Sequence, residues 1–253
     1  MTALVDLHLH TTASDGQLSP EELVRYTAQR GLQVIAVTDH DSTEGLPHAF
    51  EAAQSFPNLA VIPGIELGTD IPHGEIHILG LFIRYQDQSF QETLTKMRSS
   101  RVDRAKRMVE NLASLGMPVD WEKVLEFADG GSVGRPHVAR AMLDRGYIST
   151  QREAFDKYIG RNGPAYAERE KLTPEEAIAL IHKMGGLSIL CHPANMDDLE
   201  THVARLKSAG LVGIEVYYKD YPQHTVRSLA RLAKQYELIP CGGTDYHAVG
   251  DDG

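Results

Sequence analysis

The sequence predicts an α/β barrel that is interrupted by a helical insertion, and three observations support this prediction. Short β-rich runs alternate with helical patterns, as expected where helices join parallel strands. Between about residues 88 and 165 the alternation stops, and only helical patterns occur there. His, Asp and Glu residues also stand at or near the ends of most predicted strands. In a β/α barrel, the carboxyl ends of the strands form the active site.

Length, composition and charge limit the class of protein. The 253 residues are enough for one barrel with an insertion, and a hydrophobic content of 42% is that of a globular protein. No apolar run reaches the about 18 residues that a membrane span requires, and the first residues lack the features of a signal peptide. We therefore expect a cytoplasmic protein. The net charge of −10 disfavours a partner as anionic as duplex DNA.

Seven β-rich segments are predicted to be the strands of the barrel, which would comprise residues 1–87 and 166–253. They are Val5–His10, Val34–Thr38, Ala60–Glu66, Glu75–Phe82, Leu187–Cys191, Val212–Tyr217 and Leu238–Gly242. Two connecting helices have clear start signals, because Ser19-Pro20-Glu21-Glu22 and Thr173-Pro174-Glu175-Glu176 each combine a capping hydroxyl, a proline and a glutamate. Gly31 and Gly185-Gly186 are placed to end these helices.

The insertion, residues 88–165, is predicted to lie between the fourth and fifth strands. Its helical segments are Phe90–Leu115, Trp121–Phe127, Pro136–Arg145 and Arg152–Ile159. Residues 98–171 carry 14 Lys and Arg against 11 Asp and Glu, a net charge of +3 that leaves −13 for the rest of the chain. These charges are typical of a solvated helical surface. They also suit a basic lid that covers a phosphorylated substrate.

A set of histidines and carboxylates carries the functional prediction. His8 and His10 are two residues apart on a predicted strand, so both imidazoles point to one face. Any one of the other members alone would fit a buried or turn residue, but together they would bury many polar groups without partners. Six histidines and three carboxylates are what two or three divalent ions require. The nine predicted ligands are His8, His10, Asp15, His40, Glu66, His77, His192, Asp245 and His247.

Five motifs in this order resemble the PHP (polymerase and histidinol phosphatase) family. They are Asp6-Leu7-His8-Leu9-His10-Thr11, Thr38-Asp39-His40-Asp41, Gly64-Ile65-Glu66, Cys191-His192-Pro193 and Gly243-Thr244-Asp245-Tyr246-His247. The resemblance covers the chain outside the insertion. It implies a distorted (β/α)7 barrel and a centre of up to three metal ions, usually Mn, Zn or Fe.

The resemblance also implies how the ligands divide among the ions. His8, His10, Glu66 and Asp245 would hold one ion, and Asp15, His40 and His247 a second. His77 and His192, with Glu66 bridging, would hold the third. Many family members have a histidine at the position of Asp15, and a carboxylate is a harder ligand. We therefore expect Mn²⁺.

The insertion and Gly134-Arg135-Pro136-His137 are similar to a PHP subgroup of 3′,5′-nucleoside bisphosphate phosphatases. That subgroup includes enzymes described as 5′→3′ exoribonucleases on very short RNA. The resemblance implies a phosphomonoesterase acting on a small phosphorylated nucleotide by attack of a metal-bridging hydroxide. Asp245 would accept a proton, and His247 would protonate the leaving oxygen. The alternatives are a histidinol-phosphate phosphatase, an amide hydrolase and a metal-binding PHP module without activity.

Substrate contacts are expected mainly from the insertion. Arg135 stands at a predicted helix start, where free N–H groups favour anions. Lys157 and Arg161 are further candidates for phosphate or ribose, and Ser42 and Thr43 follow His40 in the second strand's loop. Glu215, on the sixth strand, is expected to support a ligand.

Overall fold

A computed structural model describes residues 4–71, 74–168 and 171–248, in which seven strands form one sheet whose order follows the chain. The strands are β1 (Val5–Leu9), β2 (Val34–Val37), β3 (Ala60–Ile71), β4 (Gly74–Leu81), β5 (Leu187–Leu190), β6 (Gly213–Tyr218) and β7 (Ile239–Gly243). A parallel bridge between Leu9 and Tyr246 brings the chain after β7 beside β1. The sheet is therefore a nearly closed barrel, as the sequence predicted.

The barrel is distorted at β4, which runs antiparallel to both β3 and β5. The other neighbouring pairs of strands are parallel. This corrects one expectation, because His77 lies in the first half of β4 and not near its carboxyl end. Since β4 runs in the opposite direction, its first half lies at the same mouth as the carboxyl ends of the parallel strands. His77 pairs with Gly68, two residues beyond Glu66 on β3.

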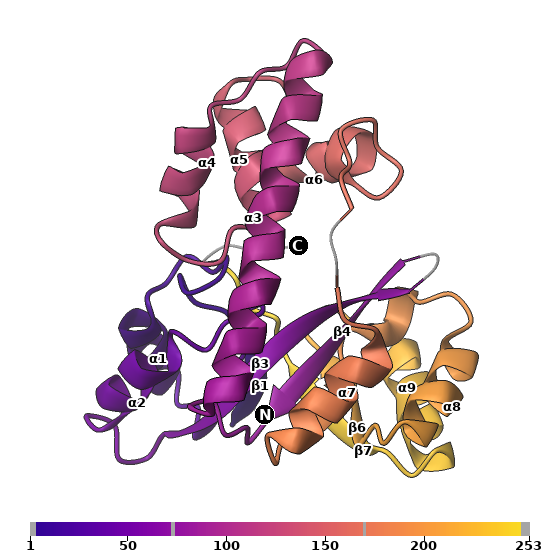
Figure 1. Ribbon diagram of the computed structural model, residues 1–253. Helices are drawn as coiled ribbons and strands as arrows, with labels where there is room; N and C mark the ends of the chain where they lie inside the picture. The colour runs from indigo at the N-terminus through magenta and orange to yellow at the C-terminus, as the bar shows by residue number, and fades with distance from the viewer. Residues whose placement is uncertain (1–3, 72–73, 169–170, 249–253) are drawn as a thin grey trace.

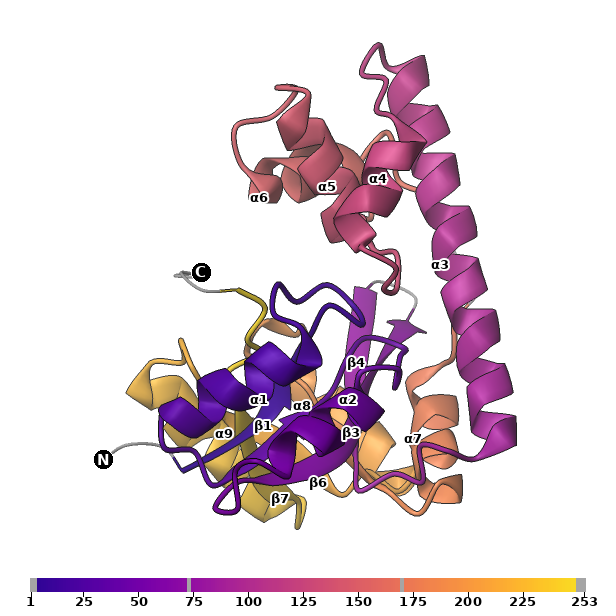
Figure 2. The same cartoon turned by 90° about the vertical axis from the view of Figure 1, so that its left-hand side faces the viewer.

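Helices cover the outside of the barrel (Figures 1 and 2). They are α1 (Pro20–Gln29), α2 (Leu46–Ala53), α7 (Pro174–Lys183), α8 (Leu199–Ser208) and α9 (Gln223–Gln235). Ser19 and Thr173 form the two predicted capping boxes, each accepting a hydrogen bond from the backbone of a glutamate three residues later. The interior of the barrel below the mouth is apolar and includes Leu79, Ile189 and Cys191.

The helices of the insertion follow β4 and precede β5 in the chain; in Figure 2 most of them lie above the barrel, and the long first helix runs from beside the barrel up to the others. They are α3 (Gln88–Ser114), α4 (Trp121–Ala128), α5 (Arg135–Asp144), α6 (Gln151–Ala154) and the π-helical turn η1 (Phe155–Ile159). Phe90, Leu94 and Met97 of α3 pack into the barrel core, whereas Met108 and Leu112 belong to a separate core in the insertion. Helix α3 thus ties the two parts together. In the described ranges, no helix has the length and apolar character of a membrane span.

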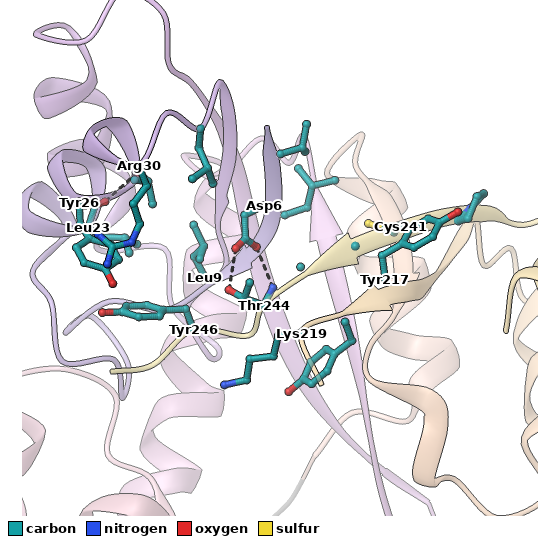
Figure 3. Close-up of a pocket in the computed structure, with 18 of the residues that line it drawn as sticks. Asp6, Leu9, Leu23, Tyr26, Arg30, Tyr217, Lys219, Cys241, Thr244 and Tyr246 are labelled. Carbon is teal, nitrogen blue, oxygen red and sulfur yellow. Dashed lines mark hydrogen bonds between the residues drawn. The ribbon is translucent and has the colours of Figure 1, made fainter. Parts of the chain in front are cut away.

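The outer wall of the barrel between α1 and α9 contains a cavity of about 880 Å³ (Figure 3). Here the Asp6 carboxylate accepts hydrogen bonds from Thr244, from its N–H at 3.0 Å and from its hydroxyl at 2.7 Å. The rings of Tyr26 and Tyr246 stack with centroids 5.5 Å apart. These contacts hold the segment after β7 from the outer side of the barrel. The same segment places Asp245 at the mouth.

Candidate metal centre

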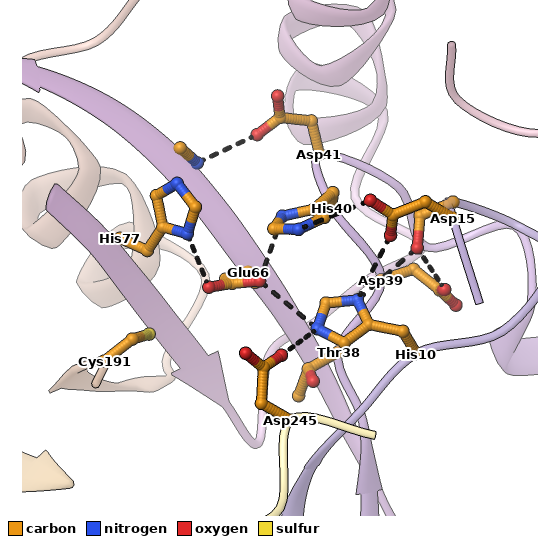
Figure 4. A network of polar contacts seen from close by, with 12 residues as sticks. His10, Asp15, Thr38, Asp39, His40, Asp41, Glu66, His77, Cys191 and Asp245 are labelled. Carbon is orange, nitrogen blue, oxygen red and sulfur yellow. Dashed lines mark hydrogen bonds and ion pairs between the residues drawn. The ribbon is translucent and has the colours of Figure 1, made fainter. Parts of the chain in front are cut away.

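Glu66 lies at the centre of a cluster of imidazoles at the barrel mouth (Figure 4). Its side chain is only 1% exposed, and its two oxygens lie 2.8–3.4 Å from ring nitrogens of five histidines. The five are His8, His10, His40, His77 and His192. A bridge between His40 and Glu66 continues the β2–β3 pairing beyond β2, which sets these two residues side by side.

The first predicted ligand set comes together around the end of β1. Asp245 Oδ1 lies 3.2 Å from His8 Nε2 and 3.1 Å from His10 Nε2. Glu66 Oε2 lies 3.4 and 3.3 Å from the same two nitrogens. Glu215 Oε1, 2.8 Å from His8 Nδ1, fixes that ring with its other nitrogen directed into the cluster. Glu215 thus contacts the predicted ligand His8, and its supporting role stays a prediction.

The second set gathers around Asp15, in the loop after β1. Asp15 Oδ1 lies 3.3 Å from His247 Nε2, and Asp15 Oδ2 lies 3.9 Å from His40 Nε2. The ring of His10 stacks on that of His247 with centroids 4.1 Å apart. The loop is held by Asp39, whose carboxylate accepts hydrogen bonds from other residues of the same loop.

The third set is more open than the other two. Glu66 Oε1 lies 2.8 Å from His77 Nδ1 and 3.2 Å from His192 Nε2. His40 also lies beside the pair of Glu66 and His77, and the Cys191 thiol lies beside Glu66 and His192. The structure therefore brings all nine predicted ligands to one mouth.

The donor atoms of the cluster fit divalent ions. Among the described residues, six buried atoms of the cluster form no hydrogen bond of regular geometry. They are His8 Nε2, His10 Nε2, Asp15 Oδ1, His40 Nδ1, Glu66 Oε2 and Asp245 Oδ1. Such atoms are costly to bury unless a further partner binds them. Two ligands at about 2.1 Å from one ion are about 3.0–3.4 Å apart in octahedral or tetrahedral geometry. The distances of 3.1–3.4 Å in the first set match this spacing.

The carboxylates of the cluster are in the ionised form that metal binding requires. Burial alone would raise the pKa of Glu66, but the surrounding imidazoles hold that pKa well below its usual range. The same balance, burial against nearby histidines, lowers the pKa of Asp15 and that of Asp245. Imidazole nitrogens with carboxylate oxygens are a donor set that suits Mn, Zn or Fe.

A group of basic side chains, which we call the basic wall, adjoins the metal cluster. Glu75 lies 2.7 Å from Arg135 Nη2, 2.5 Å from Lys171 Nζ and 4.0 Å from Arg104 Nη1. His77 Nε2 also lies near this carboxylate, at 3.8 Å. Burial raises the pKa of Glu75, but His77 and the basic side chains together lower it strongly. Glu75 therefore separates the basic wall from the metal cluster as a fixed negative charge.

Sequence reasoning found only Arg135 of the basic wall. Glu75 was detectable in principle, because it stands two residues before His77 on the same strand and so shares its face. Lys171 and Arg104 are almost fully buried, with side chains 2% and 4% exposed. No sequence pattern marks these two, because the packing of the insertion on the barrel brings them to Glu75.

The structure does not bring the remaining predicted substrate contacts to the cluster. The Lys157 ammonium lies 2.8 Å from Glu153 Oε1, one helical turn away on an exposed face of the insertion. Ser42 and Thr43 are buried at 0% and 3% exposure beneath the second-strand loop. Arg161 Nη1 pairs with a β3 aspartate at 3.0 Å, beyond Glu75 as seen from the metal cluster. These residues were chosen for their position along the chain, whereas contact with the cluster depends on the direction in which each side chain points.

Comparison with known proteins agrees with this site. The PHP domain family matches residues 6–158. The 5′-3′ exoribonuclease Rnm of Salmonella typhimurium is 35% identical over 249 residues, which cover 96% of this chain and 85% of that protein. The 3′,5′-nucleoside bisphosphate phosphatase of Chromobacterium violaceum is 30% identical over 256 residues, 99% and 90% of the two chains. A solved structure of an amidohydrolase from Chromobacterium violaceum, with bound sulfate and no metal, has a TM-score of 0.92 at 30% identity. The similarity covers 99% of this chain and 89% of that one.

The barrel, its ligand set and these similarities define an enzyme of the metal-dependent phosphoesterase class. This confirms the predicted class of phosphoric monoester hydrolase. The chain belongs to the PHP family, as its five motifs predicted.

Proposed function

We propose that the protein removes a phosphate from nucleoside 3′,5′-bisphosphates and from the 5′ ends of very short RNA. One observation carries this proposal, namely the basic wall beside the metal cluster. A substrate with a single phosphate needs only the metal cluster, whereas Arg104, Arg135 and Lys171 provide a second, separate site for an anion. Both relatives named above act, by their names, on RNA ends or on a bisphosphate.

For the metal centre we propose Mn²⁺ and the three ligand sets implied by the family resemblance. The first set, with four donors, and the second, around Asp15, each gather donor atoms that lie close together. The proposed third set is His77 and His192 with Glu66 bridging, since Glu66 Oε1 lies 2.8 Å from His77 Nδ1 and 3.2 Å from His192 Nε2. Bound divalent ions would polarise the phosphoryl oxygens and lower the pKa of a bound water.

The side chains that we propose for proton transfer differ in what their geometry supports. Asp245 Oδ1 faces into the cluster and is ionised, so it is placed to accept a proton. His247 Nδ1 donates a hydrogen bond to the backbone carbonyl of Asp245 at 2.9 Å, and Nε2 faces Asp15 at 3.3 Å. Nε2 is therefore the atom that would lose its proton to a bound ion, which favours His247 as a ligand over its predicted role as the acid.

The basic wall also separates this proposal from the alternatives. Histidinol phosphate carries a cationic amine, and Arg104, Arg135 and Lys171 would repel it. An amide substrate has no second anion for these groups to bind. A module without activity has no need of a complete ligand set, yet all nine ligand positions are filled.

Phosphate release from a panel of substrates tests the proposal. The panel contains adenosine 3′,5′-bisphosphate, adenosine 5′-monophosphate, histidinol phosphate and p-nitrophenyl phosphate, each with Mn²⁺ and with excess chelator. We expect release that chelator abolishes, fastest with the bisphosphate. Release that is unchanged in chelator would exclude the metal-dependent reaction. Fastest release from histidinol phosphate would exclude the proposed substrate class.

A further inference from the structure

Tyr218, at the end of β6, contacts the metal cluster although it is not among the nine predicted ligands. Its hydroxyl donates a hydrogen bond to Asp245 Oδ2 at 3.0 Å. A carboxylate oxygen can only accept a hydrogen bond, so the tyrosine hydroxyl is the donor in this contact.

The Asp245 carboxylate contacts imidazoles on one side and the Tyr218 hydroxyl on the other. The Asp245 backbone has a φ of 52°, a left-handed conformation that residues with a side chain rarely adopt. The two oxygens of its carboxylate have different surroundings. Oδ1 faces His8 and His10 at 3.2 and 3.1 Å, and Oδ2 faces the Tyr218 hydroxyl. Tyr218 thus determines which oxygen points into the cluster.

A bulge in β6 directs Tyr218 toward the mouth. Glu215 pairs with Cys241 of β7, but Tyr217 pairs with the very next residue of β7, so β6 contains one extra residue. In a regular strand, Glu215 and Tyr217 would share a face. The bulge instead puts Tyr218 on the face of Glu215, where its hydroxyl reaches Asp245, whereas Tyr217 is 57% exposed. Bulges of this kind reorient side chains next to active sites.

Strand β6 therefore supports two ligands of the same set from one face. Glu215 holds the ring of His8 through Nδ1, and Tyr218 holds the carboxylate of Asp245 through Oδ2. We propose that Tyr218 is a positioning residue, whose hydroxyl holds Asp245 so that Oδ1 alone faces the metal site. This inference rests on the proposed role of Asp245 as a metal ligand.

Metal affinity of the purified protein tests the inference, with Tyr217→Phe as the matched control on the same strand. Tyr218→Phe removes one oxygen and keeps the ring, so the melting temperature in excess chelator should equal that of the control. Loss of a group that orients a ligand costs about 10- to 100-fold in metal affinity. We expect one Mn²⁺ to bind about 10- to 100-fold more weakly to Tyr218→Phe, and as in wild type to Tyr217→Phe.

Two further measurements distinguish a wrong positioning role from a structural defect and from a wrong ligand set. Activity of Tyr218→Phe should recover as the Mn²⁺ concentration rises, which a general structural defect would not show. If Tyr218→Phe binds Mn²⁺ like wild type while Asp245→Asn binds it weakly, the positioning role is wrong and the ligand set stands. If Asp245→Asn also binds Mn²⁺ like wild type, the proposed ligand set itself is wrong.

Discussion

The metal cluster and the basic wall lie next to each other, but the chain builds them in opposite ways. Seven of the nine predicted ligands lie at the end of a strand or in the loop directly after one, and the two exceptions, Glu66 and His77, lie within β3 and β4. The members of the basic wall come from α3, from α5 and from the segment before α7. Only the packing of the insertion on the barrel brings them together around Glu75.

This difference suggests a division of roles, which we call the division: the metal cluster performs the reaction, and the basic wall selects the substrate. The sheet positions the predicted ligands, so we expect the reaction chemistry to be a property of the barrel. Glu75 pairs with Arg135 of the insertion and with Lys171 of the segment between the insertion and α7, so we expect substrate preference to depend on how the insertion packs. The predictions below test this division, from the largest expected effect to the smallest.

Glu66→Gln should have the largest effect, because the carboxylate contacts five imidazoles and belongs to the first and third proposed ligand sets. Metal ions contribute several kcal/mol to such reactions, so we expect a loss of about 1,000-fold or more in kcat. The loss should be the same for a bisphosphate and for p-nitrophenyl phosphate. The control is Glu51→Gln on the exposed side of α2. A loss confined to one substrate would contradict the division.

Arg135→Ala should act on substrate preference and not on the chemistry. A charge-assisted hydrogen bond is worth about 1.5–3 kcal/mol, which corresponds to a loss of roughly 10- to 150-fold in kcat/KM for a 3′,5′-bisphosphate. Turnover of p-nitrophenyl phosphate should stay near the wild-type value. The control is Arg152→Ala, whose side chain is 88% exposed. An equal loss on both substrates would place Arg135 at the reacting phosphate or in the fold.

Metal affinity should rise with pH. Burial lowers the pKa of His77 and that of His247, but the carboxylates of Glu66 and Asp15 raise them to about 9 and about 10. Both rings are therefore positively charged at pH 7 in the metal-free protein, with a proton on each nitrogen. Metal binding must displace one of these protons from each ring. Each displaced proton makes affinity rise about tenfold per pH unit between pH 7 and 9. Titration calorimetry in buffers of different ionisation enthalpy measures this proton release. Affinity that is flat over this range would contradict the raised pKa values.

Lys157→Ala should have the smallest effect. Its ammonium pairs with Glu153 on an exposed face of the insertion, and exposed pairs contribute little. We expect less than about a twofold change in kcat/KM for either substrate. A large loss on the bisphosphate would show that the insertion closes over the mouth and brings Lys157 to the substrate.

The same division explains how much could be predicted from the sequence. The period of two residues in a strand is visible in the sequence, so the shared face of His8 and His10 could be predicted before the structure was known. The predicted end of the third strand at Glu66 was wrong, because β3 continues to Ile71. The place of Tyr218 could not be predicted, because a regular strand would put Tyr217 on the same face as Glu215. The bulge in β6 puts Tyr218 there instead. Arg104 and Lys171 depend on contacts between distant segments, which no local pattern encodes.

The most direct test of the account is the ratio of two kcat/KM values, measured with the Mn²⁺-loaded protein. The substrates are adenosine 3′,5′-bisphosphate and adenosine 3′-monophosphate, which differ by one phosphate. If the basic wall binds a second phosphate beside the metal cluster, the bisphosphate should be preferred by about 10- to 150-fold. This preference should fall to near one in Arg135→Ala. A ratio near one in the wild-type protein would contradict the account.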